Sequence, residues 1–369
     1  MGNRCLLLQV IGTHDHRDDA LSEMLELEQL VATYGGKIIE KSVQHRVNPH
    51  PSTYIGPGKV EWLKSIVKEK NIDIVILNAV VNSGQLFRLE KELWSVNIGI
   101  AIWDRVDLIL HIFDQHASTT EAKLQIELAR IQHLGPRMYG LGGTVLSRQG
   151  GGIGTRGMGE TNLEKERRLI KKRTQQIRQE LKQRSKGQAN RIEQRKQKGM
   201  KTVALVGYTS AGKTSLFNAF TSKQKQSDQG LFTTLDSVVG KLKITEAMPG
   251  VLISDTIGFI ENLPTFLIDA FRSTLLESLS AQLLFHVVDA SDPKLPQKMQ
   301  VVVEILHELG VKTVPIVVLN KIDLVDREKI DILNEKFKEK NHIFVSAKTG
   351  EGVAEAKNLI RKTLLNVTY

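Results

Sequence analysis

The sequence has only one cysteine, Cys5, among its 369 residues. A single cysteine cannot form an internal disulfide, which fits a reducing compartment, so we expect a cytoplasmic protein. Long hydrophobic runs are also lacking, because the apolar stretch at residues 6–11 is far too short to span a membrane. The start, MGNRCL, has Leu6 where N-myristoylation requires Ser or Thr, so this lipid anchor is not expected either.

Acidic residues are outnumbered, with 41 Asp and Glu against 51 Lys and Arg and a net charge of +10. Most of the excess falls in one segment, since residues 160–198 hold 14 Lys or Arg but only 5 Glu, a net charge of +9. Such a charge run is common on a solvated helix face, and it also suits a polyphosphate surface such as RNA. Composition alone leaves both interpretations open.

Hydrophobic patterning divides the chain into three regions. Residues 1–115 alternate short apolar runs with helical patterns, which predicts a parallel α/β domain. Residues 116–198 are predicted to form a helical hairpin linker, with a glycine-rich loop at residues 140–159 and a second helix from about residue 161. Residues 199–369 return to alternating strands and helices, which predicts a doubly wound α/β sheet. The second linker helix carries a near-heptad seam of Leu163, Ile170, Ile177 and Leu181.

A glycine-rich turn, GYTSAGKT, lies at residues 207–214 between a predicted strand and a predicted helix. It fits the P-loop pattern G-x-x-x-x-G-K-[ST], in which backbone N–H groups at a helix N-terminus bind phosphates. Lys213 would add positive charge toward the β and γ phosphates, and the Thr214 hydroxyl would bind Mg²⁺. The predicted phosphate-binding residues are Gly207, Tyr208, Thr209, Ser210, Ala211, Gly212, Lys213, Thr214 and Ser215.

Two later segments are predicted to respond to the γ phosphate. The first, DTIG, follows a strand: Asp255 is placed to hold Mg²⁺ through water and the Gly258 amide to sense the phosphate, with Thr256 and Ile257 between them. The second, LFTTLDS, offers a threonine that could close over Mg²⁺; Thr233 and Thr234 are both candidates, and Thr234 is preferred. Phe232, beside them, is also predicted to contact the nucleotide. The predicted metal ligands are Thr214, Thr234 and Asp255. The predicted catalytic residues are Lys213, Thr234 and Gly258.

Base selection is predicted from two motifs at later strand ends, NKID and SAK. The Asp323 carboxylate can accept from both N1–H and the exocyclic amine of guanine, whereas adenine offers no such donor pair. The Ala347 amide would donate to guanine O6. The predicted base-binding residues are Asn320, Lys321, Asp323, Ser346, Ala347 and Lys348.

The residue after Gly258 is Phe259, where many GTPases carry a glutamine that orients the attacking water. An apolar ring cannot perform that task. We therefore expect slow intrinsic turnover, on the order of 10⁻⁴ to 10⁻² s⁻¹, and activation by a partner.

These motifs occur together with YIGPGKVEWL, DRVDLILHIF, EAKLQIELARIQHLGPR and LSRQGGGIGTRGMGETNLEKERRLI, and jointly they resemble the HflX family of ribosome-associated GTPases. The resemblance covers nearly the whole chain. It implies a GTPase that uses GTP/GDP and Mg²⁺, binds the large ribosomal subunit and helps to split stalled or idle ribosomes. It also implies that the N-terminal domain and the linker bind ribosomal RNA. We expect a monomer. The chain departs from the family in having Val106-Asp107 for Thr-Gly, NAVVNSGQ for an acidic stretch, and GMGE for GPGE.

The glycine segment GGGIGTRGMGETN at residues 150–162 has the spacing of a dinucleotide-binding turn. The strand before it is poor, and no acidic residue follows at the distance that such a turn requires. A flexible hairpin tip and an RNA-contacting tip are the other interpretations, and we favour the last. The predicted RNA contacts are Arg148 and Arg156 near the tip and Arg167, Arg168, Lys171, Lys172 and Arg173 on the basic helix.

Three other functions remain open at this point. A tRNA-modification-type GTPase would share the apolar residue after the switch glycine. A nucleotide-driven RNA remodeller would need a second nucleotide site in the N-terminal domain. An RNA-binding protein with a degenerate nucleotide site is disfavoured, because Lys213, Thr214 and Asp255 are all present.

Overall fold

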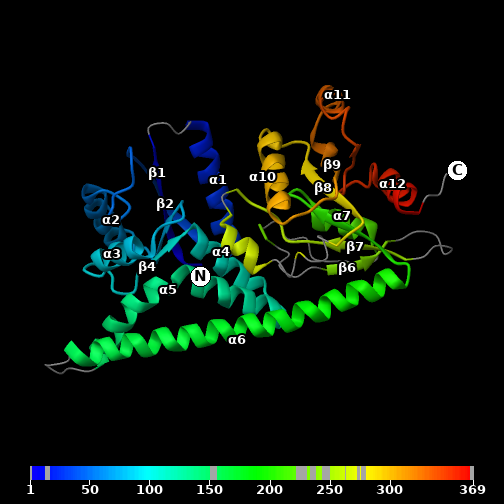
Figure 1. The fold of residues 1–369 in the computed structure, drawn as a ribbon. Coiled ribbons are helices and arrows are strands. Elements are labelled where there is room, and N and C mark those ends of the chain that lie inside the picture. The colour runs from blue at the N-terminus through cyan, green and yellow to red at the C-terminus, as the bar shows by residue number, and fades with distance from the viewer. Residues whose placement is uncertain are drawn as a thin grey trace. The chain divides into compact units, whose positions relative to one another are not determined.

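The computed structural model describes residues 2–12, 17–149, 156–221, 231–232, 238–242, 250–261, 263–271, 275 and 280–365 (Figure 1). The chain forms two compact units. The first contains residues 1–115 and 123–180, and the second contains residues 116–122 and 181–369. The three-region division predicted above remains a prediction.

The first unit is built on a four-stranded sheet in the order β2-β1-β3-β4, with all neighbours parallel, as predicted. Its core lies between the sheet and helices α2 and α3, which contribute leucines and valines such as Leu63, Val67, Leu86 and Leu89. The elements are β1 (Arg4–Ile11), α1 (Arg17–Tyr34), β2 (Lys37–His45), α2 (Pro57–Glu69), β3 (Ile74–Leu77), α3 (Ser83–Leu93), β4 (Ala101–Asp104) and α4 (Arg105–His116).

Helix α4 begins directly after β4 and was not predicted from the hydrophobic pattern. Eight of its first nine residues are buried, so the helix has no polar face along most of its length. The sequence from Ala101 to His116 holds no Gly or Pro, so it offers no break that would mark where the strand ends and the helix begins.

The linker helices α5 (Thr120–Gln149) and α6 (Arg156–Gln197) extend further than predicted. The glycine-rich loop predicted at residues 140–159 is wrong in extent, because residues 140–149 belong to α5 and residues 156–159 to α6. Glycine costs only about 1 kcal/mol per residue in a helix, which long flanking helices can offset. In the predicted seam, Ile177 is fully buried, while Ile170 and Leu181 are partly buried. The side chain of Leu163 lies outside the described residues.

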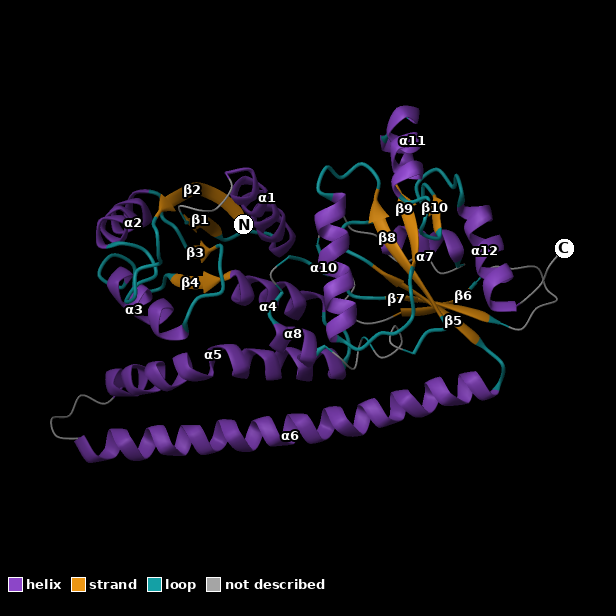
Figure 2. Cartoon of the chain, turned by 45° about the horizontal axis from the view of Figure 1, so that its top comes forward, coloured by secondary structure: helices purple, strands orange, loops and turns teal. Residues whose placement is uncertain are grey.

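The second unit contains a six-stranded sheet in the order β10-β9-β8-β5-β7-β6, in which only the β6–β7 pair is antiparallel. Helices α7 and α12 cover one face and α10 and α11 the other, as a doubly wound sheet requires (Figure 2). The elements are β5 (Lys201–Val206), α7 (Lys213–Phe220), β6 (Val238–Lys241), β7 (Val251–Asp255), α8 (Thr265–Ala270), β8 (Leu283–Asp289), α10 (Leu295–Glu308), β9 (Ile316–Asn320), the 3₁₀ turn η1 (Ile322–Leu324), α11 (Arg327–Lys336), β10 (His342–Phe344) and α12 (Val353–Leu365).

Neighbouring residues of β8 and β9 point to opposite faces of this sheet. Val287 and Val318 pack under α7 and α12, whereas Val288 and Leu319 pack under α10 and α11. Both strands are therefore buried on both faces, which explains their continuous hydrophobic sequences. Among the helices that the structure describes, none is long and apolar enough to cross a membrane.

Candidate nucleotide site

The P-loop connects β5 to α7 and needs unusual backbone angles. Ser210 has φ +59° and Gly212 has φ +92°, in the left-handed region. A Cβ on Gly212 would stand 2.2 Å from Asn320 Nδ2, so only glycine fits here. Asn320 in turn donates from Nδ2 to the Ala211 carbonyl at 2.8 Å. This contact joins the phosphate-binding turn to the NKID motif.

Lys213 is buried at the first position of α7. Its Nζ donates to the carbonyls of Gly207 at 3.0 Å and Tyr208 at 2.7 Å. Burial lowers the pKa of Lys213 to about 8, and the Asp255 carboxylate partly opposes this shift. An anionic phosphate would give the ammonium group the counter-charge that its buried position lacks.

Thr214 and Asp255 lie together, as the predicted metal site requires. The Thr214 hydroxyl donates to Asp255 Oδ2 at 3.0 Å, and Asp255 is fully buried at the end of β7. Hydroxyl and carboxylate oxygens are the ligands that Mg²⁺ prefers beside substrate phosphates. The buried hydroxyl of Thr209 has no hydrogen-bond partner among the described residues, which is consistent with a site shaped for a polar ligand.

The DTIG segment packs directly on the P-loop. A Cβ on Gly258 would stand 2.7 Å from Thr209 Cγ2 and 3.1 Å from Lys213 Nζ, so a side chain would displace the lysine. The next residue, Phe259, binds the P-loop through its backbone: its N–H donates to Gly207 O at 3.1 Å, and its carbonyl accepts from Thr209 N at 2.7 Å. Its ring is only 2% exposed, so it is a core side chain.

Tyr208 adds a third connection between these segments. Its hydroxyl accepts from the Glu261 N–H at 2.7 Å, while Lys298 Nζ lies 5.0 Å from the centre of its ring. The P-loop and the segment after Gly258 are therefore joined by hydrogen bonds at Phe259 and at Glu261.

The predicted base-binding residues come together at the ends of β9 and β10. Ser346 Oγ donates to Asp323 Oδ1 at 2.6 Å, which orients the carboxylate. Ala347 N donates to Asn320 Oδ1 at 3.0 Å, so a bond to guanine O6 would have to share or replace this one. Lys321 has φ +64°, and its Nζ lies 2.6 Å from Asp289 Oδ2. Lys348 is exposed.

Two residues of the second unit were missed from the sequence. Asp289 ends β8 and holds Lys321, a position that the polar loop after the strand could have indicated. His286 is buried in the same strand, where burial, Lys213 and Lys340 lower its pKa to about 3 and keep it neutral. No sequence pattern distinguishes such a histidine from one on the surface.

The remaining predicted residues are only partly described. Thr233 and Thr234 lie outside the described residues, as do the side chains of Arg148 and Arg156. Phe232 is buried with φ +59°.

On the basic helix, most of the predicted RNA contacts are solvent-exposed. These are Arg167, Arg168, Lys171 and Lys172. Arg173 differs, because it forms two hydrogen bonds with the Glu127 carboxylate of α5, at 2.7 and 2.6 Å.

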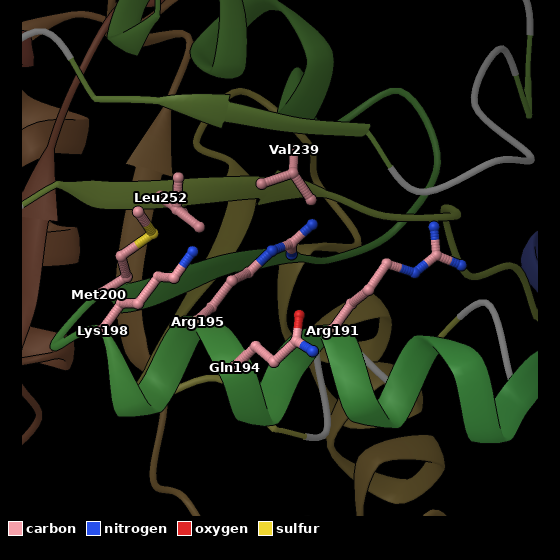
Figure 3. Close-up of a pocket in the computed structure, with 7 residues that line it drawn as sticks. All are labelled: Arg191, Gln194, Arg195, Lys198, Met200, Val239 and Leu252. Atoms are coloured by element: carbon pink, nitrogen blue, oxygen red, sulfur yellow. The ribbon is translucent and has the colours of Figure 1, made fainter.

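A cationic pocket of about 330 Å³, also missed, lies in the second unit between the end of α6 and the strands β6 and β7. Figure 3 shows Arg195, on α6, and Lys198, just after its end, extending toward the strands that carry Val239 and Leu252. None of its seven lining residues is acidic, so the pocket favours an anion. They are Arg191, Gln194, Arg195, Lys198, Met200, Val239 and Leu252.

Comparison with known proteins gives a consistent result along the chain. Residues 22–114 match the family described as "GTP-binding GTPase N-terminal", residues 116–197 its "Middle Region", and residues 202–321 the family "50S ribosome-binding GTPase". GTPase HflX of Alkalihalophilus pseudofirmus is 39% identical over 96% of this chain and 82% of its own. GTPase HflX of Escherichia coli K12 is 36% identical over 96% of this chain and 81% of its own.

The chain belongs to the HflX family of GTPases. Its fold is similar to that of a GTP-binding protein from Sulfolobus solfataricus crystallised with GDP, with a TM-score of 0.51, 23% identity, and coverage of 99% of this chain and 100% of that one. Family membership and the assembled nucleotide site confirm the prediction of an enzyme that hydrolyses GTP. They also confirm the resemblance drawn from the sequence.

Proposed function

We propose that this GTPase binds the large ribosomal subunit, that the subunit activates GTP hydrolysis, and that the nucleotide cycle drives the splitting of stalled or idle ribosomes. The observation that carries the proposal is Phe259. Its ring is buried and its backbone is bound to the P-loop, so the residue after Gly258 cannot orient water. The group that orients the attacking water therefore comes from a partner.

Within the site, each element has a defined task. Lys213 and the P-loop amides bind the β and γ phosphates, and Thr214 and Asp255 hold Mg²⁺, with Thr234 joining them. Mg²⁺ would neutralise charge on the phosphates during transfer. Asp323, oriented by Ser346, selects guanine by accepting from its two donors. The Gly258 amide reports the presence of the γ phosphate.

The ribosomal partner is supported by charge. Arg167, Arg168, Lys171 and Lys172 are exposed along two turns of α6 and can contact phosphates of ribosomal RNA. Arg148 and Arg156, near the glycine-rich tip, would extend this surface. We propose that the protein works in the cytoplasm as a monomer. Nothing in the part of the chain that the structure describes favours tRNA modification or a second nucleotide site.

The test is single-turnover GTP hydrolysis by the full chain, alone and with saturating large or small ribosomal subunits. We expect roughly tenfold or greater stimulation by large subunits and little by small ones, within the range that partner groups supply to other GTPases. Sucrose-gradient analysis of intact ribosomes would then measure splitting in the presence of GTP. A rate that large subunits leave unchanged would overturn the proposal.

A further inference from the structure

The cationic pocket at the end of α6 lies wholly within the second unit. Its helix side is formed by Arg191, Gln194 and Arg195, which lie on one face of the last two turns of α6. Lys198 follows directly after the helix and continues this face, because its N–H still donates to the Gln194 carbonyl at 3.1 Å. We call Arg191, Arg195 and Lys198 the cationic rim of the pocket.

The opposite side of the pocket is apolar. Leu252 of β7 is paired with Lys241 of β6, and Val239 lies two residues from Lys241, so Val239 and Leu252 point to the same face of the sheet. Leu252 is buried, and Val239 and Met200 are partly buried. Figure 3 shows these three side chains opposite the last turns of α6. We call Val239, Leu252 and Met200 the apolar floor.

The rim and the floor do not match as the two sides of a packed core would. A helix that packs on an apolar sheet face normally turns an apolar stripe toward it. The end of α6 instead turns two arginines and a glutamine toward Val239 and Leu252, and about 330 Å³ of space lies between them. This arrangement suits a third component that is apolar where it meets the sheet and anionic where it meets the helix.

The side chains of the pocket also indicate the chemical class of that component. Guanidinium groups bind phosphates through two parallel hydrogen bonds and stack on planar rings, and an ammonium adds a point charge. Arg191 uses one of its five N–H donors, Nε, on the Gly187 carbonyl at 3.3 Å. The Gln194 amide offers both a donor and an acceptor, which suits the polar edge of a base or a sugar hydroxyl.

The size of the pocket favours a compact ligand. Its volume lies at the lower end of the range of about 300–1,000 Å³ that is typical of small-molecule sites. A folded protein partner would require a contact of roughly 800 Å² on each side. A bare inorganic anion would leave the apolar floor unused. A phosphate ester that carries a flat, weakly polar ring satisfies both sides of the pocket.

The pocket is separate from the P-loop site but shares a strand with it. None of its seven lining residues belongs to the predicted nucleotide-binding set. Leu252 lies three residues before Asp255 on β7, and Asp255 accepts from the Thr214 hydroxyl of the P-loop. A ligand on the apolar floor would therefore touch the strand that carries a predicted metal ligand.

We propose that this pocket binds a nucleoside phosphate, with the phosphate on the cationic rim and the base on the apolar floor. Two sources offer this chemistry: a free nucleotide and an unpaired nucleotide of an RNA strand. The site does not depend on ribosome binding or on the activation of GTP hydrolysis.

The first pair of variants adds one negative charge to the last turn of α6 with almost no change in shape. Gln194→Glu places a carboxylate in the pocket. Gln197→Glu is the matched control, because Gln197 is exposed and does not line the pocket. Both positions are on the surface of the helix, so both variants should fold.

The second pair removes two positive charges. Arg191→Gln with Lys198→Gln removes two members of the cationic rim. Lys186→Gln with Lys196→Gln removes the same charge from two exposed residues of α6 outside the lining.

The measurement uses full-length protein saturated with GDP and Mg²⁺, so that the P-loop site is filled. Calorimetric titration with ADP tests the free nucleotide, and fluorescence anisotropy with a labelled hexauridylate tests the RNA strand. We expect Gln194→Glu and the rim variant to lower the affinity for the bound probe about tenfold or more, and the two controls about twofold or less. The bound probe should also raise the melting temperature of the wild type and of Gln197→Glu.

Binding of ADP would identify a free nucleotide as the ligand, whereas binding of hexauridylate alone would identify an RNA strand. Equal effects of Gln194→Glu and Gln197→Glu on both probes would overturn the proposal, because the attraction would then be general to the basic helix. Binding of hexaglutamate in the pocket, with neither phosphate probe affected by the rim variant, would also overturn it and indicate an acidic peptide.

Discussion

The nucleotide site and the basic surface of α6 hold their charges in opposite ways. In the first, Lys213, Asp255 and Lys321 are buried or partly buried, and each bonds a defined atom at 2.6–3.0 Å. On the second, residues such as Arg168 and Lys171 are exposed to solvent. A buried charge interacts with particular atoms at fixed distances. Exposed charges attract a partner through their summed charge, which salt screens. Substitutions should therefore have large, position-specific effects in the site and graded effects on the helix.

Lys213→Ala should have the largest effect. The change removes the buried ammonium that faces the phosphates, so GTP binding or hydrolysis should fall on the order of 1000-fold. Equilibrium binding of a fluorescent GTP analogue, followed by a hydrolysis assay, measures both steps. Because Nζ also bonds the Gly207 and Tyr208 carbonyls, circular dichroism must show that the variant is folded. Near-normal turnover by a folded variant would contradict the assignment of the P-loop.

Asp323→Asn should change which base is bound rather than remove binding. An amide can donate to the xanthine oxygen, so preference should shift from GTP toward xanthosine triphosphate by about 100-fold or more. Ser346 still has an oxygen to donate to in this variant. Competition binding with the two nucleotides tests the shift, and Asp326→Asn, at the N-cap of α11, is the control. Unaltered selection of GTP would show that the base pocket lies elsewhere.

Phe259→Ala separates stability from nucleotide affinity. Removing a ring that is only 2% exposed should cost about 3–5 kcal/mol in the free energy of unfolding, because a cavity remains. The backbone bonds of residue 259 to the P-loop need no side chain, so GTP affinity should stay nearly intact while the variant is folded. Urea unfolding and GTP binding at low temperature test the two parts. A large loss of affinity in the folded variant would show that the ring supports the phosphate site directly.

Charge reversal on α6 should give a smaller, graded effect. Arg167→Glu with Arg168→Glu should weaken binding to large subunits about tenfold and lower the salt slope by roughly 2 or more. The control reverses Lys182 and Arg184, two exposed cations further along the same helix. Loss of binding in the control as well would favour general attraction over a defined surface. Unchanged binding in both would favour a solvated face without RNA contacts.

Most residues predicted for the nucleotide site lie close together in the structure, whereas the helices differ from their predicted extents. Gly212 and Gly258 could be assigned because a phosphate-binding backbone excludes side chains there, and the structure confirms the close approaches to Asn320 and Lys213. The parallel sheets were predicted from the alternation of short apolar runs with helical patterns. Helix α4 was missed, because no Gly or Pro separates it from strand β4 in the sequence. The extension of α5 to Gln149 was missed, because glycine is a weak signal against helix over a long segment.

The ion pair between Arg173 and Glu127 could not be predicted from the sequence either, because it forms only when α5 and α6 lie side by side. Both side chains are about 40% exposed, so solvent screens this pair and it contributes little to stability. The cationic pocket was missed for the same reason, because its lining residues come from the end of α6 and from the strands β6 and β7.

The smallest effect concerns pH and tests the buried charge of Lys213 without any mutation. Burial lowers its pKa from the usual 10.5 to about 8, so free protein loses this positive charge as the pH rises through 8. Bound phosphates favour the charged form, so the pKa rises again in the complex and GTP binding takes up a proton above pH 8. Affinity should thus be nearly constant below pH 7 and fall about tenfold between pH 7 and pH 9.

The Lys213→Ala variant should lack this fall, provided that residual binding can be measured. Calorimetry in two buffers of different ionisation enthalpy measures the proton uptake directly. No uptake at pH 8.5 would show that Lys213 remains charged in the free protein, and that its carbonyl partners and Asp255 outweigh its burial.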